Sequence, residues 1–274
     1  MKLSEILELV PHGPDTFVGT GPRYPWGGLY GGQIVAQALR AAATTVDDGL
    51  DVHSLRAYFI RRGDQDEPVR YEVDRTRNGR SFATRRVIAR QATGAILNLE
   101  ASFQRHEDSE EVEAVSYDPS ITRPQELPST SWSPAFERSF VPGPPPTEGV
   151  RPGAGRAAAW LKVSEPMCDD QLHHRAAFAF LSDDLPTDAV VRAHPVSREA
   201  GVEHEKVLFT ASLDHTIWFH RPLRADEWHL HDFTCHTFVG GRGLAIGQIF
   251  SGAGAHVATV AQEVLLRDRR IGAE

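Results

Sequence analysis

Two adjacent residues, Asp214 and His215, are the first candidates for acid–base chemistry, because a carboxylate and an imidazole can form a catalytic dyad. They lie in Leu213–Phe219, a segment that alternates in character and mixes aromatic with β-branched residues, as a half-buried strand does. Neighbouring strand residues point to opposite faces, so the two side chains cannot both line one site. We therefore expect Asp214 to be structural and paired with a nearby arginine or histidine.

A histidine-rich strand, WHLHDFTCH, is a second candidate. His229 and His231 are two residues apart and share a strand face, and Cys235 and His236 follow closely. A zinc site would need a third ligand in tetrahedral geometry and partners that orient the ligands. Because the chain has 13 histidines, some are expected to be close neighbours by chance. We therefore expect no metal ion, and a metal site on these histidines is the minor alternative. Cys235 and Cys168 have no Cys-x-x-Cys spacing and fit a reducing compartment.

Six arginines between residues 75 and 90 form the only basic run in an acidic chain. Arginine suits bidentate phosphate contacts, although a solvated sheet face explains the run equally well. The residues are Arg75, Arg77, Arg80, Arg85, Arg86 and Arg90. The net charge of −8 and the pI of about 5.9 argue against a nucleic-acid partner. There is no Gly-x-Ser-x-Gly elbow, which disfavours an α/β-type serine hydrolase.

An internal repeat indicates how these residues are positioned. Leu55–Gly63 (LRAYFIRRG) resembles Thr210–Pro222 (TASLDHTIWFHRP), with Tyr58-Phe59 in the place of Trp218-Phe219. The two segments are about 160 residues apart, and a repeat of well over one hundred residues indicates a duplicated domain, because the units of solenoid proteins are far shorter. Each copy is predicted to be an α+β unit in which an antiparallel sheet wraps a central helix.

The predicted helices are Gln33–Ala43, which is rich in small apolar residues, and its counterpart Asp170–Leu181. The predicted strands are Val52–Ile60, Val69–Thr76, Ser81–Arg90 and Ala95–Phe103 in the first unit, and Ala157–Ser164, Val207–Leu213, Asp214–Phe219, Trp228–Phe238, Arg242–Ser251 and His256–Leu266 in the second. On this pattern the second unit repeats the first element for element.

The segment 105–155 is predicted to be a Pro-rich linker, since it has no sustained period and contains PGPPPTEG at Pro142–Gly149. Trp132, Phe136 and Phe140 suggest that part of it is held against a domain surface. The expected organisation is an N-terminal unit over 1–104, the linker over 105–155 and a C-terminal unit over 156–274.

The chain shows no sign of a membrane segment or a leader. Its N-terminus, MKLSEILELVPHG, carries acidic residues, and nowhere are there about 18 consecutive apolar residues. We expect a cytoplasmic protein with no membrane insertion. A long sheet with an exposed edge also makes a homo-oligomer the expected state.

A helix wrapped by an antiparallel sheet, twice in one chain, resembles the double hotdog arrangement of acyl-CoA thioesterase II, the TesB type. Six stretches carry the likeness and sample both halves of the chain: Tyr30–Leu39 (YGGQIVAQAL), His53–Gly63 (HSLRAYFIRRG), Asn78–Arg86 (NGRSFATRR), Phe180–Asp183 (FLSD), Leu213–Pro222 (LDHTIWFHRP) and Val260–Arg267 (VAQEVLLR).

The resemblance implies a catalytic group of Asp, Thr and Gln in the second unit, which falls on Asp183, Ser212 and Gln262. Ser212 departs from the family's threonine: it keeps the hydroxyl but loses the methyl group that restricts χ1. Because hotdog sites form between two units, Gly31, Gly32 and Gln33 are the candidates for the oxyanion site on the opposite wall. Arg77, Arg80, Arg85 and Arg86 become candidates for the phosphates of coenzyme A.

The implied reaction is hydrolysis of fatty acyl-CoA to free fatty acid and CoA by an activated water, with no metal or organic cofactor. The alternative is a non-catalytic acyl-CoA-binding or regulatory protein with the same pocket. Asp183 could also be a simple helix-end residue, with Asp184 reactive in its place. A third possibility is another hotdog enzyme, such as a hydratase of enoyl thioesters, and it is disfavoured because we see no Asp/His pair on the helix to do that work.

Overall fold

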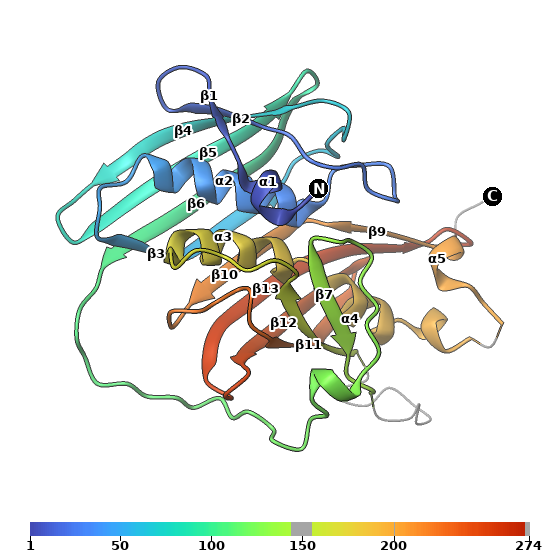
Figure 1. Ribbon diagram of the computed structural model, residues 1–274. Helices are drawn as coiled ribbons and strands as arrows, with labels where there is room; N and C mark the ends of the chain where they lie inside the picture. Colours follow the sequence, from blue (N-terminus) through green and yellow to red (C-terminus); the bar gives the residue numbers. More distant parts are fainter. Residues whose placement is uncertain (144–154, 200, 272–274) are drawn as a thin grey trace.

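The two strands that resemble each other in sequence pair with each other at the centre of one continuous sheet. In the computed structural model, β3 (Leu50–Phe59) and β10 (Asp214–Phe219) are antiparallel, with Tyr58 opposite Asp214 and Ser54 opposite Trp218. Since Tyr58 and Trp218 are equivalent in the repeat, the two halves are related by a local two-fold axis through this pair. The model describes residues 1–143, 155–199 and 201–271 (Figure 1).

In the described part of the chain the sheet has 13 strands, in the order β1-β2-β4-β5-β6-β3-β10-β13-β12-β11-β8-β7, with β9 paired to β13 (Figure 1). The other strands of the N-terminal half are β1 (Val10–Pro11), β2 (Thr16–Gly19), β4 (Val69–Asn78), β5 (Phe82–Gln91) and β6 (Gly94–Arg105). Those of the C-terminal half are β7 (Phe136–Phe140), β8 (Arg156–Val163), β9 (Leu208–Ser212), β11 (His229–Val239), β12 (Arg242–Ser251) and β13 (His256–Asp268). The two halves of this sheet, each curved around a central helix, confirm the predicted tandem hotdog fold.

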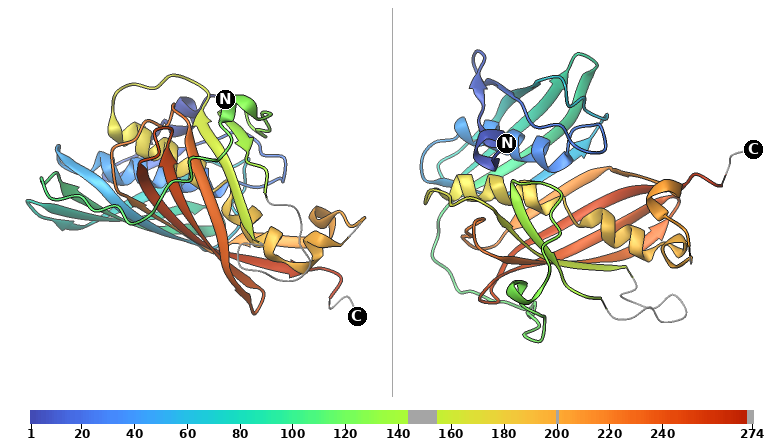
Figure 2. Two further views of the ribbon diagram at one scale, coloured as in Figure 1. Left: turned by 90° about the horizontal axis from the view of Figure 1, so that it is seen from below. Right: turned by 45° about the vertical axis from the view of Figure 1, so that its right-hand side comes forward.

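Helices α2 (Gly31–Thr44) and α3 (Gln171–Ser182) lie side by side inside the curved sheet (Figures 1 and 2). The short helix α1 (Leu3–Leu7) packs on α2. Alanines cover much of α2, and Ala36, Ala38, Ala41 and Ala42 are fully buried, which allows the strands to approach the helix closely. Helix α3 begins at Asp170, whose carboxylate accepts the N–H of Leu172 at 2.9 Å, and it ends at Asp183.

The second half is not an element-by-element copy of the first, which corrects that prediction. Between α3 and β9 it contains α4 (Pro186–Ala193), the 3₁₀ turn η2 (Pro195–Arg198) and α5 (His204–Val207). Pro186 starts α4 because its fixed φ suits the first turn, where no N–H partner is needed. Helix α4 packs on β8 and β11–β13, so the C-terminal half of the sheet carries a second helix besides α3.

The segment predicted to be a linker contributes to the C-terminal sheet. After the turn η1 (Pro124–Glu126), β7 pairs antiparallel with β8, so Phe136 and Phe140 are held as predicted, but as strand residues. On the outer face of the sheet this segment covers a second small core formed by Ile121, Val141, Ala158, Trp160, Leu230 and Phe250. Most of the Pro142–Gly149 run lies outside the described residues. None of the helices in the described part of the chain is long and apolar enough to span a membrane.

A buried ion pair fixes β7 to the end of α3. Arg138 Nη1 lies 2.9 Å from one oxygen of Asp184 and 3.0 Å from the other, and both side chains are largely buried.

We expect Arg138→Ala to lower the free energy of unfolding by about 3–5 kcal/mol, since it leaves a buried carboxylate unpaired. Urea unfolding measures this loss. The matched control is Arg242→Ala, which removes an exposed pair with Glu263 and should cost less than about 1 kcal/mol. Equal effects of the two substitutions would contradict the structural role of the Arg138–Asp184 pair.

Candidate active site

Asp183 lies at the junction of the two halves, directly after α3, and only 7% of it is exposed. The pKa of its carboxyl is raised from 3.8 to about 7, mainly by burial and to a smaller extent by the negative charge of the neighbouring Asp184. Hydrogen bonding from the Gln262 side chain, the Gly32 N–H and the Ser212 side chain acts in the opposite direction and holds the pKa down. A carboxyl with this pKa can take up and release a proton near neutral pH.

The structure brings Asp183, Ser212 and Gln262 together. Ser212 ends β9 and pairs with Val264 of β13, while Gln262 lies two residues earlier on β13 with its side chain fully buried. The Gln262 Nε2 donates to Ser212 Oγ at 2.8 Å. Among the described residues, Asp183 Oδ1 has no hydrogen-bond partner although it is buried. This oxygen is therefore free to accept a proton from a small molecule in the site.

The glycines of the first half allow the N-terminus of α2 to approach Asp183. A Cβ on Gly31 would lie 2.6 Å from Asp183 Oδ2 and 2.9 Å from Phe59 Cζ. A Cβ on Gly32 would lie 2.4 Å from the carbonyl oxygen of Phe180. The first N–H groups of a helix have no partner within the helix, so they are available to an anion here. Gly31 and Gly32 therefore lie close to Asp183 and the end of α3, and their role at an oxyanion stays a prediction.

Gln33 does not belong to the site, which corrects its prediction as an oxyanion residue. Its backbone N–H already donates to Tyr30 O at 3.2 Å. Its fully buried side chain accepts from the Tyr24 hydroxyl at 2.7 Å and donates to Gln37 Oε1 at 3.3 Å. Gln33 therefore belongs to a polar network within the N-terminal core.

The sequence singles out His215 but assigns it no role, and the structure places it against Gln262. It is fully buried on β10; its Nδ1 lies 2.5 Å from Gln262 Oε1 and its Nε2 lies 2.8 Å from Ser182 Oγ. Asp214 points the other way, pairs with Arg56 at 3.3 Å and accepts the Glu263 N–H at 2.7 Å, so its predicted structural role is confirmed. The sequence signal that could have indicated this role of His215 is its place on the strand face that otherwise carries apolar residues.

Asp184 is not an alternative base. Besides its pair with Arg138, it accepts the indole N–H of Trp132 at 2.6 Å. Trp132 packs in turn against Tyr30, with ring centroids 5.1 Å apart, and Tyr30 packs against Phe180 at 4.9 Å. The result is an aromatic wall beside Asp183, built from both halves and the intervening segment.

Of the four arginines predicted to bind phosphate, Arg85 is excluded because it is buried and all its donors are used. Its guanidinium donates to Thr45, Asn78 and the carbonyl oxygens of Arg77 and Thr84. Its contact with Thr45 places it at the end of α2 remote from Gly31, about 20 Å away along the helix. The other three predicted arginines are exposed, and their role in binding coenzyme A stays a prediction: Arg77, Arg80 and Arg86.

His229 and His231 share a face of β11, as predicted, and their rings pack against Phe178 of α3. Burial lowers the pKa of His229 to about 4 and that of His231 well below its ordinary value, so both are neutral core residues at pH 7. Within the described ranges, no group of three or more His, Cys, Asp or Glu side chains is arranged to hold a metal ion.

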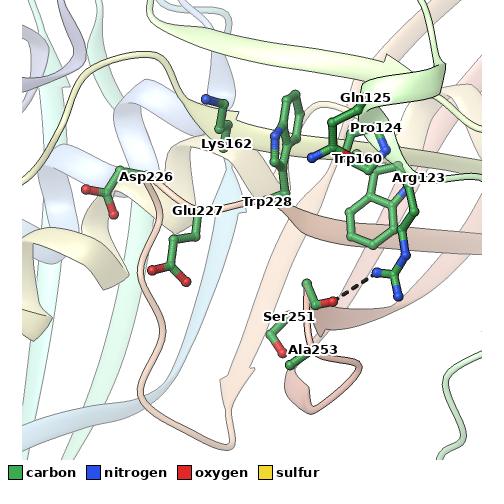
Figure 3. A pocket seen from close by; sticks show the side chains of 11 residues that line it. Arg123, Pro124, Gln125, Trp160, Lys162, Asp226, Glu227, Trp228, Ser251 and Ala253 are labelled. Carbon is green, nitrogen blue, oxygen red and sulfur yellow. Dashed lines mark hydrogen bonds between the residues drawn. The ribbon is translucent and has the colours of Figure 1, made fainter.

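A cavity of about 500 Å³ opens on the outer face of the C-terminal sheet (Figure 3). Trp160 and Trp228 line it together with Arg123, whose guanidinium donates to Gly252 O at 2.9 Å. Trp160 alternates along β8 with Leu161, which faces the helices. The cavity is therefore on the side of the sheet opposite to Asp183 and contains none of the predicted site residues.

Comparison with known proteins identifies the family to which the chain belongs. Residues 20–104 match the model of the acyl-CoA thioesterase N-terminal domain, and residues 109–266 match that of the acyl-CoA thioesterase C-terminal domain. Acyl-coenzyme A thioesterase 8 of Rattus norvegicus is 35% identical over 97% of this chain and 89% of its own length. Acyl-CoA thioesterase 2 of Haemophilus influenzae is 32% identical over 97% of this chain and 95% of its own.

A solved structure, the acyl-CoA thioesterase II TesB2 of Mycobacterium marinum, superposes with a TM-score of 0.83 at 33% identity and covers 99% of both chains. The tesB protein of Mycobacterium avium subsp. paratuberculosis gives a TM-score of 0.79 at 30% identity, over 97% of this chain and 98% of its own. With matches to both domain models and near-complete coverage of these relatives, the chain belongs to the acyl-CoA thioesterase family with the double hotdog fold.

Proposed function

We propose that this protein hydrolyses fatty acyl-CoA to free fatty acid and CoA, with Asp183 as the general base. The observation that carries the proposal is a buried carboxyl with a pKa of about 7, whose Oδ1 is free and whose surroundings include Ser212 and Gln262. Relatives named acyl-CoA thioesterase, similar over almost the whole chain, support the same reaction.

The reaction needs one water and one proton carrier. The Asp183 carboxylate accepts a proton from water as the water oxygen attacks the thioester carbonyl carbon. The C–S bond of the tetrahedral intermediate then breaks, and the leaving thiolate takes the proton back from Asp183, which releases CoA as the thiol and the acyl group as the acid. The carboxyl returns to its starting state, so the cycle needs no other reactant.

Neighbouring groups have two tasks in this scheme. The Ser212 hydroxyl and the Gln262 amide orient the water, which fixes the direction of attack. At the start of α2 the Gly31 N–H stabilises the oxyanion, while the Gly32 N–H donates to the Asp183 carboxyl, and the positive end of the helix dipole adds to the stabilisation of negative charge. The second half thus supplies the base, and the first half supplies the wall that stabilises negative charge.

A non-catalytic acyl-CoA-binding protein is the alternative from another class. It would keep the pocket and bind the thioester without releasing thiol. Thiol release over acyl chains of increasing length separates the two functions and also measures the preferred chain length.

Asp183→Asn should lower kcat by about 10²–10⁴-fold, the usual contribution of a positioned base. In the unmodified protein, kcat/KM should rise tenfold per pH unit below about pH 7 and level off above it, because only the ionised carboxyl accepts a proton. A thiol-trapping assay with a medium-chain acyl-CoA between pH 5 and 9 measures both. A wild-type rate in Asp183→Asn would exclude this mechanism.

The same substitution predicts a gain in stability, which serves as a folding control. The folded-state pKa of Asp183 lies above its unfolded value, so ionisation of this group opposes folding as the pH rises from about 4 to about 7. Asp183→Asn should therefore be more stable than the wild type at pH 8, by up to about 4 kcal/mol, and similar to it at pH 4. Urea unfolding at the two pH values measures the difference.

Gly31→Ala should abolish most activity, because its Cβ would collide with the Asp183 carboxylate and Phe59. We expect a loss of about 10²-fold or more in kcat, comparable to the removal of an oxyanion donor. Gly143→Ala is the matched control, since a Cβ there meets nothing within 4 Å. Full activity in Gly31→Ala would show that the helix start does not need to approach Asp183 so closely.

We also propose that two copies of the chain associate through the outer face of β3 and β10. Large apolar side chains lie exposed there, Tyr58, Ile60 and Trp218, whereas the strands at the two sheet edges have only two and five residues. Trp218→Glu should lower the mass measured by sedimentation, and Val239→Glu, an exposed position away from this face, should not. A wild-type chain that sediments as a monomer contradicts the proposal.

A further inference from the structure

A buried chain of hydrogen bonds starts at the residue before Asp183 and returns to the catalytic group through two strands. Ser182 Oγ lies 2.8 Å from His215 Nε2, and His215 Nδ1 lies 2.5 Å from Gln262 Oε1. Gln262 Nε2 lies 2.8 Å from Ser212 Oγ. Ser182, His215 and Gln262 are each fully buried, so water does not compete for these bonds.

His215 is neutral in this environment. Burial lowers the pKa of its imidazole from 6.5 to about 4, against a smaller opposing effect of the bond to Gln262. A neutral imidazole has one N–H donor and one acceptor nitrogen, so His215 can donate on one side only and must accept on the other. The chain of bonds therefore has one of two directions.

The carboxylate of Asp183 selects the direction. If Nδ1–H donates to Gln262 Oε1, then the amide N–H groups of Gln262 point toward Ser212 and Asp183, and Nε2 accepts the Ser182 hydroxyl. In the reverse direction Ser182 donates to Ala179 O, which lies 3.0 Å away, and the Gln262 carbonyl oxygen faces the carboxylate. Two acceptors face each other in that case, which is unfavourable in a buried site.

We propose that His215 and Ser182 are positioning residues of the hydrolysis: they hold the Gln262 amide with its N–H groups toward Ser212 and Asp183. Without His215 the amide can turn by half a rotation with almost unchanged shape, because its two ends differ only in donor and acceptor character. The proposal rests on the function proposed for Asp183 and Gln262 and adds two residues that touch neither water nor thioester.

Loss of this orientation should also change the titration of Asp183, since hydrogen bonding from Gln262 lowers the pKa of that carboxyl. The other charged or titratable groups near Asp183 are Asp184, Tyr30 and Arg138. Asp184 is held in its ion pair with Arg138 on β7, and burial raises the pKa of Tyr30 well above its ordinary value, so Tyr30 does not titrate near pH 7.

The test compares His215→Leu with His215→Asn. The leucine variant should have a kcat about tenfold to hundredfold lower than the wild type, and its KM should change less than about twofold. This loss of rate is larger than that expected from one missing hydrogen bond and smaller than that expected from loss of the base. Its pH–rate profile should shift to higher pH. The asparagine amide N–H can occupy the place of Nδ1–H, so His215→Asn should recover most of the rate and the wild-type profile. His220→Leu, an exposed histidine near the end of the same strand, is the matched control and should behave as the wild type.

A double-mutant cycle separates positioning from general damage. If His215 acts through Gln262, then Gln262→Ala with His215→Leu should be no slower than Gln262→Ala alone. Losses that multiply, or a wild-type rate and pH profile in His215→Leu, would overturn the proposal. If circular dichroism shows that the leucine variant does not fold, Ser182→Ala replaces it. Ser182→Ala should lower kcat less than His215→Leu and should shift the pH–rate profile in the same direction, to higher pH. An unchanged pH–rate profile in Ser182→Ala would count against the proposal. A fully active Asp183→Asn variant would instead refute the proposed base, so the two failures are distinguishable.

Discussion

The contact between the Asp183 carboxyl and the start of α2 is the constraint on which the site depends. A buried carboxylate is costly, and here Gly32 N–H, Gln262 and Ser212 offset part of that cost while the pKa still rises to about 7. The contact requires two glycines on α2 and a fixed spacing between the helices. That spacing follows from the pairing of β3 with β10, which joins the two sheets about a local two-fold axis.

The local symmetry also explains why only one of two equivalent places carries this group. Ala101 lies opposite Arg85 on the neighbouring strand, as Gln262 lies opposite Ala245, and Thr45 follows α2 as Asp183 follows α3. In the first half, Arg85 fills the space between these positions and donates to Thr45. One copy thus has a long cation that closes its core, and the other has a small alanine that leaves room for an amide and a carboxyl.

The sequence predicts most of this fold because strand alternation, the glycine-rich start of α2 and the echo of LRAYF by HTIWF are local signals. It does not predict α4, because Asp184-Leu-Pro reads as a stop after α3 although Pro186 begins another helix. It also misassigns Gln33 and Arg85, whose polar side chains are buried by partners distant in the chain, Tyr24 and Thr45. His215 escapes for the same reason: its role depends on Gln262 and Ser182, which are neighbours only after β10 and β13 have paired beside α3.

The departure at Ser212 can be understood from the same contacts. A serine in place of threonine loses the methyl group that restricts χ1, so its hydroxyl would turn more freely on an isolated strand. Here Gln262 Nε2 donates to Ser212 Oγ, and the amide is held in turn at its other end by His215. A hydrogen bond thus replaces the steric restriction that the methyl group would provide. Because the hydroxyl accepts this bond through a lone pair, its own proton remains available to the Asp183 carboxyl.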